Sequence, residues 1–333
     1  MSKSVDRPRT APATISVSLR GGFETDEHAR QFGELIAAYV GEFSRYMELG
    51  TLDGVTIAAN YGQALLDLDL GYAASQRLKA SDKLAVGIAM TPSVLRDGQL
   101  KSHMVFDAAA IIGLEDLSNP LYGRAFHLLA HECAHVEVTA RFDAAFPGMI
   151  LRKRPANLHD HHRWEVIGVC WDEYAVTQIC ANYGQPSTDA YEEIFLEALN
   201  VTRSRANAFI RQYRLHGKLN QVLAEVYGCY GELMKFSCYF LGDLAGRSLT
   251  LHDRPAAKSA LDRSWFAPHF EKLHVICESI ALEYGRWRDL SVFEALGDLV
   301  DEVVSYGGLY IQNKQTDGRF DVDIPLTSET TPD

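Results

Sequence analysis

The segment that most constrains this 333-residue chain is His131-Glu132-Cys133-Ala134-His135, in which two histidines stand four residues apart. Residues i and i+4 lie on the same face of an α-helix, so the two imidazoles can converge on one ion if this segment is helical. Glu132 follows the first histidine and can then contact a water molecule bound to that ion. The spacing predicts a helix with a zinc site, in which His131 and His135 are ligands and Glu132 is the general base.

The residues around the motif favour one long helix. Asn119-Pro120 can supply an N-cap followed by proline at the first helical position, and 121–141 contains no proline. Apolar residues recur there at helical spacing, namely Leu121, Ala125, Leu128, Leu129, Cys133 and Val136. Such a helix is amphipathic or largely buried, and polar side chains inside it need a partner, which a metal ion would provide for His131 and His135.

His127 extends the column of histidines by one turn, and a His127–His131 pair would have the same ligand spacing. Glu132 flanks the first member of the later pair, where a base is expected, so we favour His131 and His135 as the ligands. We expect His127 to support the site or to pack beside it. In the alternative interpretation His131 and His135 only form hydrogen bonds in a core or face solvent, and Glu132 is a surface charge.

A catalytic zinc site usually has three protein ligands and one open position, so a third ligand must come from elsewhere. Arg141 stands six residues beyond His135, which excludes a third histidine at that position of an extended motif. A helix is predicted over 163–182, and Glu173 falls within its apolar stripe. The apolar residues of this stripe are Val166, Val169, Cys170, Val176 and Cys180. Burying a carboxylate is unfavourable unless a cation compensates it, so we predict Glu173 as the third ligand.

Two alternatives for Glu173 remain. It could form a buried ion pair with Arg163 or Arg124. A histidine from the connection between the two helices could also replace it, and three stand there: His159, His161 and His162. One of these histidines, or Tyr174, could stabilise the oxyanion of a tetrahedral intermediate, and we name Tyr174 as the catalytic candidate beside Glu132.

Together these residues resemble the gluzincin group of zinc metallopeptidases, in which HExxH on one helix is completed by a glutamate on a later helix. The resemblance covers 122–182. The matching residues are His131, His135 and Glu173 for the ligands and Glu132 for the base. The run 172–175 is loosely similar to the second motif of ImmA/IrrE-like cytosolic peptidases. The resemblance implies a Zn²⁺-dependent hydrolase of peptide bonds that acts on a protein or peptide substrate.

Two other functions fit the same residues. A helical interaction or regulatory protein could carry a structural or inactive zinc site, closed by a fourth ligand such as His159, His161 or His162. A zinc hydrolase that acts on a non-peptide amide would need the same ligands and the same base.

The composition is that of an ordinary globular protein. Hydrophobic residues make up 47% of the chain, which is ample for a core, and the net charge of −12 argues against general binding to nucleic acids or anionic membranes. Charged residues interrupt the most apolar stretch, 226–244, so we expect no membrane span. Residues 1–12 lack the apolar segment of a secretory signal, and the six cysteines form no CxxC pair. We therefore expect a cytoplasmic protein with reduced cysteines.

Periodicity predicts an α+β protein that is mostly helical. Strands at 15–19, 84–90 and 104–112 indicate a small antiparallel or mixed sheet before the motif helix, with a helix at 25–48 and a turn at 96–98. The edge of this sheet could align an extended peptide. Later helices are predicted at 189–215, 219–245, 265–284 and 291–306, followed by a hairpin of 310–313 and 319–324.

We expect five parts along the chain. These are a flexible N-terminus (1–14), a zincin-like metallopeptidase core (15–186), a helical portion packed on the core (187–308), a C-terminal hairpin (309–326) and a flexible tail (327–333).

Overall fold

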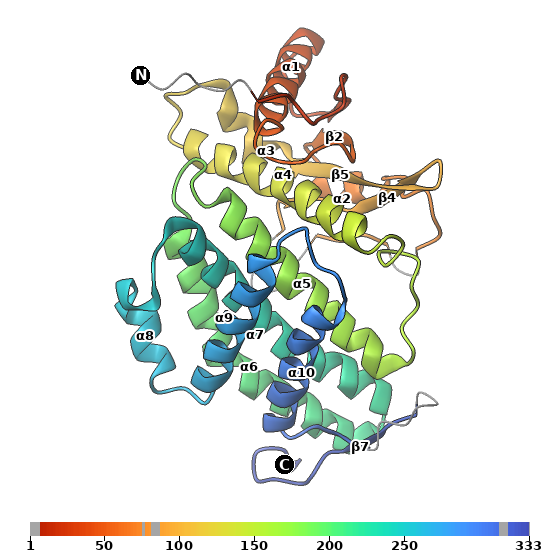
Figure 1. Ribbon diagram of the computed structural model, residues 1–333, viewed down its shortest axis with the longest axis vertical. Helices are drawn as coiled ribbons and strands as arrows, with labels where there is room; N and C mark the ends of the chain where they lie inside the picture. The colour runs from red at the N-terminus through yellow and green to blue at the C-terminus, as the bar shows by residue number, and fades with distance from the viewer. Residues whose placement is uncertain (1–6, 75–76, 81–86, 313–318, 333) are drawn as a thin grey trace. The chain divides into compact units, whose positions relative to one another are not determined.

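The computed structural model describes residues 7–74, 77–80, 87–312 and 319–332, and it confirms an α+β protein in which helices predominate (Figure 1). The chain divides into two compact units. The first unit contains residues 1–144 and 179–186, and the second contains residues 145–178 and 187–333. The first unit is therefore discontinuous in sequence, because the chain leaves it and returns for one short segment.

The first unit is built around a mixed sheet. Its strands are β1 (Val17–Arg20), β2 (Leu52–Ala58), β3 (Ala89–Met90), β4 (Ser93–Arg96) and β5 (Gln99–Asp107). They are arranged in the order β1-β2-β5-β3, and β4 also pairs with β5. The pairs β1–β2 and β2–β5 are parallel, whereas β3 and β4 run antiparallel to β5. Within the described residues, β3 thus lies at the end of the strand order and antiparallel to its neighbour.

Helices accompany this sheet in the first unit (Figure 1). They are α1 (Asp26–Phe43), α2 (Tyr61–Leu66), α3 (Ala108–Ile111), the 3-10 helix η1 (Ile112–Glu115) and α4 (Tyr122–Ala145). The Thr25 hydroxyl caps α1 by accepting a hydrogen bond from the main chain of His28 at 3.0 Å. Before α4, the side chain of Asn119 accepts from Leu121 N at 2.9 Å. The motif helix therefore starts where the sequence predicted.

The sheet contains the turn that the sequence predicted at 96–98. The strand that leads into this turn is β4, whereas the sequence predicted a strand at 84–90. β4 pairs with β5 across Asp97 and Gly98, whose φ angles are 49° and 74°. Positive φ at both central residues matches the twist of a two-residue hairpin. Of the predicted strand at 84–90, residues 89 and 90 form β3 and residues 87 and 88 are not in a strand, whereas 84–86 lie outside the described residues.

The predicted strand at 104–112 was too long. β5 ends at Asp107, and an Ala-rich segment then forms α3. The Asp107 carboxylate caps this helix by accepting from Ala109 N at 2.8 Å. Alanine has a high helix propensity, so the cap and the three alanines outweigh the apolar pattern that suggested a strand.

A polar network joins three strands of the sheet. Arg96 of β4 donates two hydrogen bonds to Asp53 of β2, at 3.0 and 2.9 Å. The imidazole of His103 in β5 lies between Asp53 (Nδ1–Oδ2, 2.9 Å) and Thr56 (Nε2–Oγ1, 2.9 Å). This network fixes the hairpin of β4 and β5 beside β2.

The second unit is almost entirely helical. It contains most of α5 (Leu158–Cys180), together with α6 (Thr188–His216), α7 (Leu219–Arg247), the 3-10 helix η2 (Leu251–Asp253), α8 (Pro255–Leu261), α9 (Ala267–Leu282), α10 (Ser291–Tyr306) and the antiparallel strands β6 (Tyr310–Gln312) and β7 (Asp321–Asp323). The four helices predicted after Pro186 correspond to α6, α7, α9 and α10, whereas α8 was not predicted. Among the described residues, no helix is both long and apolar enough to cross a membrane.

An ionic cluster links α5 to α10 within the second unit. Arg163 donates hydrogen bonds to Asp301 (2.6 Å), Glu294 (2.7 Å) and Asp298 (3.0 Å). Asp301 also accepts a hydrogen bond from the Tyr227 hydroxyl at 2.6 Å. The Arg163 guanidinium is buried on α5, and these carboxylates of α10 compensate its positive charge.

Both described ends of the chain make specific contacts, although the sequence suggested loose termini. The Thr10 hydroxyl donates to the carbonyl oxygen of Ser44 at 2.9 Å. At the other end, the Glu329 carboxylate accepts hydrogen bonds from Arg203 (3.1 Å) and Asn207 (2.8 Å). The described parts of 1–14 and 327–333 thus pack on the helices of their own units.

The segment that returns to the first unit approaches α4 at Gly184. This residue has φ of +69°, and a Cβ added to it would lie 2.2 Å from the carbonyl oxygen of Gly123 and 2.8 Å from His127 N. We expect Gly184→Ala to lower the free energy of unfolding by about 2–4 kcal/mol, since it adds backbone strain to a clash with main-chain atoms. Urea unfolding monitored by circular dichroism measures this change.

Gly217 provides the matched control. It also has positive φ (+67°), but an added Cβ would meet nothing within 4 Å. Gly217→Ala should therefore cost only about 1 kcal/mol, from backbone strain alone. Equal losses in the two variants would contradict the close approach of Gly184 to α4.

Candidate metal centre

The predicted pair of histidines lies in the middle of α4 with its rings close together. The Nε2 atoms of His131 and His135 are 3.1 Å apart, and the two rings meet edge to face. Two nitrogens bound to one tetrahedral zinc ion at about 2.0–2.1 Å would lie about 3.3 Å apart. The pair is therefore spaced as two ligands of one ion would be.

The environment of His131 favours its neutral form. The residue is 8% exposed. Burial lowers the pKa of His131 well below its usual value, and the charges of His135 and His127 lower it further. Because metal ions bind the neutral imidazole, His131 is in the ligand form at neutral pH.

Glu132 is buried beside the edge of the sheet. It is 4% exposed, and its Oε2 accepts a hydrogen bond from the Thr91 hydroxyl at 2.7 Å. Thr91 directly follows β3. This contact orients the carboxylate that the sequence identified as the base, and Thr91 is a site residue that the sequence analysis missed.

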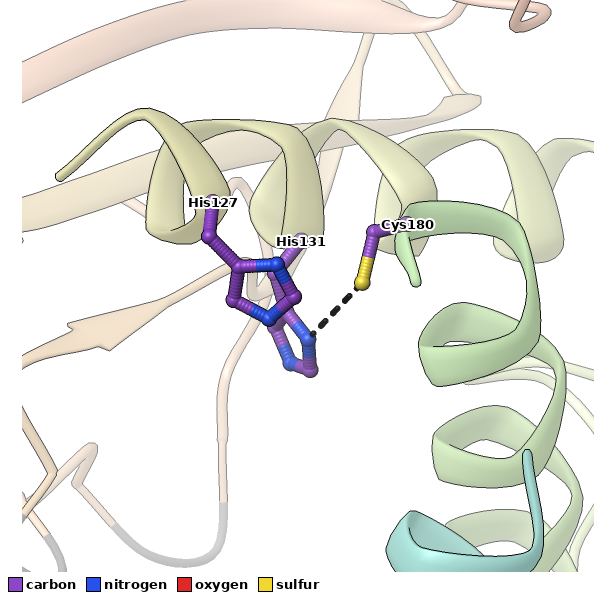
Figure 2. Close-up of side chains that lie close together, drawn as sticks. All are labelled: His127, His131 and Cys180. Atoms are coloured by element: carbon purple, nitrogen blue, oxygen red, sulfur yellow. Dashed lines mark hydrogen bonds between the residues drawn. The ribbon is translucent and has the colours of Figure 1, made fainter. Parts of the chain in front are cut away.

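Two further contacts lie next to the motif, on the side where Cys180 is found. Figure 2 shows the rings of His127 and His131 on one side of α4, with Cys180 at the end of α5 facing His131. The Cys180 sulfur lies 3.6 Å from His131 Nδ1, and His127 Nδ1 donates a hydrogen bond to the carbonyl oxygen of Tyr183 at 3.0 Å. His127 thus lies beside the motif, where the sequence placed it, and Cys180 is a neighbour that the sequence assigned only to the core.

Glu173 and Tyr174 lie on the part of α5 that belongs to the second unit. Glu173 is half-buried, and its carbonyl oxygen accepts a hydrogen bond from the Thr177 hydroxyl at 2.7 Å. Tyr174 is fully buried and stacks on Trp171, and burial raises the pKa of its phenol. The roles of Glu173 as ligand and Tyr174 as oxyanion stabiliser stay predictions, and the surroundings of Tyr174 are those of a core residue.

The three histidines placed by the sequence in a connecting loop are helical. His159, His161 and His162 form the first turns of α5, which starts earlier than predicted because Asn157 accepts a hydrogen bond from Asp160 N at 2.8 Å. His159 Nε2 lies 2.8 Å from Asp301 and is part of the ionic cluster of the second unit. His162 Nδ1 lies 3.0 Å from Glu165.

Clusters of potential metal ligands occur in each unit. In the first, donor atoms of His127, His131 and Cys180 all lie within 4.8 Å of one another. In the second, the same holds for His161, His162 and Glu165, of which only His162 is buried. These clusters could hold a metal ion, and the buried one in the first unit includes a residue of the predicted motif.

Comparisons with known proteins gave no match to a family model, a curated protein or a solved structure.

All six cysteines are buried and free of disulfides. Burial raises the pKa of the Cys133 and Cys238 thiols, which further lowers the population of reactive thiolate. We expect the native metal-free protein to react slowly with a thiol reagent such as Ellman's reagent, and the denatured protein to release all six equivalents. Fast reaction of even one thiol in the folded protein would show that a cysteine side chain is more accessible than described.

Proposed function

We propose that this protein is a zinc-dependent metallopeptidase whose reaction centre lies on α4. The observation that carries the proposal is the pairing of His131 and His135, with Nε2 atoms 3.1 Å apart, next to the buried carboxylate of Glu132. Two neutral imidazoles and an adjacent carboxylate are the groups that hydrolysis by a metal-activated water requires.

The third ligand in this proposal is Glu173. Helix α5 is continuous to Cys180, whose sulfur is 3.6 Å from His131. Glu173 precedes Cys180 by seven residues, about two helical turns, and so it lies on nearly the same face of α5. Asp172 lies about 100° away around the helix. We therefore favour Glu173 over Asp172 as the ligand, because Glu173 shares the face of α5 that carries Cys180.

Glu132 acts as the general base and then as the general acid. Its carboxylate accepts a proton from the attacking water and passes it to the leaving amine. The Thr91 hydroxyl holds Oε2 at 2.7 Å and so limits the rotation of the carboxylate. A zinc ion bound here would polarise the scissile carbonyl and lower the pKa of water.

The edge of the sheet offers a platform for the substrate. β3 lies at one end of the strand order, and the residue that follows it, Thr91, contacts Glu132. An extended peptide that added to this edge by main-chain hydrogen bonds would pass beside the base. We therefore propose an extended segment of a protein or peptide as the substrate, and the buried, free cysteines favour a reducing compartment such as the cytoplasm.

A second candidate is a protein with a structural zinc site and no hydrolytic activity. The observation that favours it is the Cys180 sulfur beside His131, because thiolate ligands are common in closed structural sites. In that case zinc would be retained and Glu132 would have no role in any reaction. A zinc hydrolase of non-peptide amides would use the same residues as the peptidase.

The base assignment predicts that Glu132→Gln lowers kcat/KM on a fluorogenic peptide library by at least about 100-fold, since general-base catalysis contributes about 10²–10⁴-fold. Zinc content should stay unchanged. Glu137→Gln is the control, because Glu137 is also buried on α4 but accepts a hydrogen bond from Glu48 N. Full activity in Glu132→Gln would exclude this mechanism.

The ligand assignment predicts that the wild type and Cys180→Ser, which lacks the thiol beside His131, each hold about one zinc ion per chain, as measured by elemental mass spectrometry. Adding His135→Ala or Glu173→Ala to Cys180→Ser should abolish zinc binding. Asp172→Ala should retain it, because its side chain points to another face of α5. Retention of zinc in Glu173→Ala together with loss in Cys180→Ala would instead favour the structural site.

A further inference from the structure

His131 has different neighbours at its two ring nitrogens. Nε2 faces His135 at 3.1 Å, and this is the side used in the proposed reaction. Nδ1 faces the sulfur of Cys180 at 3.6 Å. Metal-bound histidines usually direct their second nitrogen to a carboxylate or a carbonyl group, so a cysteine at this position calls for another explanation.

The distance between sulfur and nitrogen fits metal coordination. With a Zn–S bond of about 2.3 Å and a Zn–N bond of about 2.0–2.1 Å, two tetrahedral ligands lie about 3.6 Å apart. The Cys180 sulfur and His131 Nδ1 are separated by 3.6 Å. This separation is therefore compatible with one ion bound to both atoms.

The hydrogen bond made by the His127 ring suits the role of a third ligand. Its Nδ1 donates to the carbonyl oxygen of Tyr183 at 3.0 Å, so in the neutral ring the lone pair is on Nε2. A hydrogen bond of this type fixes the ring orientation and the tautomer of metal-binding histidines. A donor atom of His127 lies within 4.8 Å of those of His131 and Cys180.

The three side chains define the class of ion. His127, His131 and Cys180 are 6%, 8% and 0% exposed, and a cysteine thiolate would supply the negative charge that a buried cation needs. One thiolate and two imidazoles favour thiophilic ions such as Zn²⁺, Cd²⁺ and Cu⁺ over Mg²⁺ or Ca²⁺.

We propose that His127, His131 Nδ1 and Cys180 form a second site for a thiophilic metal ion, and that an ion bound there excludes metal from the His135 side of His131. A neutral imidazole has one lone pair, so an ion on Nδ1 leaves the ring proton on Nε2. The Cys180 thiol releases its proton to solvent when it binds. Occupation of the second site would therefore inhibit the reaction proposed above.

The experiment is a titration of the metal-free full-length protein with Cd²⁺ alone, followed by the ultraviolet sulfur-to-cadmium charge-transfer band. The band should appear in the wild type and in His135→Ala and Glu173→Ala, and it should be lost in Cys180→Ser and weakened in His127→Ala. Cys133→Ala is the control, because Cys133 is equally buried but its sulfur lies 4.0 Å from that of Met104. It should keep the full band.

The absence of a band in the wild type, or an undiminished band in Cys180→Ser, would overturn the second site. If Cys180→Ser fails to fold, as judged by circular dichroism, the His127→Ala and wild-type titrations still decide the question. His162→Ala removes a ligand of the separate cluster with His161 and Glu165. In that variant, the exclusion of one site by the other predicts about one Cd²⁺ per chain at saturation, and two would overturn it. The band does not depend on peptide hydrolysis. A band without peptidase activity would support the second site and contradict the proposed function, whereas activity without a band would do the reverse.

Discussion

The close approach of two backbones, at Gly123 on α4 and Gly184 in the returning segment, is the contact on which the candidate metal centre depends. Gln185 N donates to the carbonyl oxygen of Gly123 at 3.0 Å, and the glycines leave no side chains between the two segments. This proximity brings Tyr183 to His127 and Cys180 to His131. The chemistry of α4 is therefore determined by residues about 50 positions later as well as by its own motif.

Much of the helical fold could be predicted because long helices are encoded locally. α10 was predicted with its observed limits, and α6 and α7 within one or two residues at each end, since a glycine with positive φ ends α6. The strands were harder, because β3 has only two residues and the residues after β5 form a helix. Short strands depend on pairing with distant segments, and a single sequence contains little information on that pairing.

The candidate site was likewise predictable only where it depends on local sequence. The spacing of His131 and His135 is a local property of one helix, so their proximity followed from the sequence. The contacts of Thr91 with Glu132 and of Cys180 with His131 join residues that are 41 and 49 positions apart, and no local pattern indicates them. Helical periodicity was also an imperfect guide on α5, where Val169 belongs to the predicted apolar stripe but is 41% exposed.

The discontinuity of the first unit has a consequence for the order of events during synthesis. The chain is made from its N-terminus, so α4 is complete while the segment 179–186 has not yet been made. At that stage His131 and His135 are present and Cys180 is absent. A metal ion that bound the nascent chain would therefore meet the histidine pair before the thiol could compete for it, and the connectivity of the fold would favour loading of the proposed Nε2 site first.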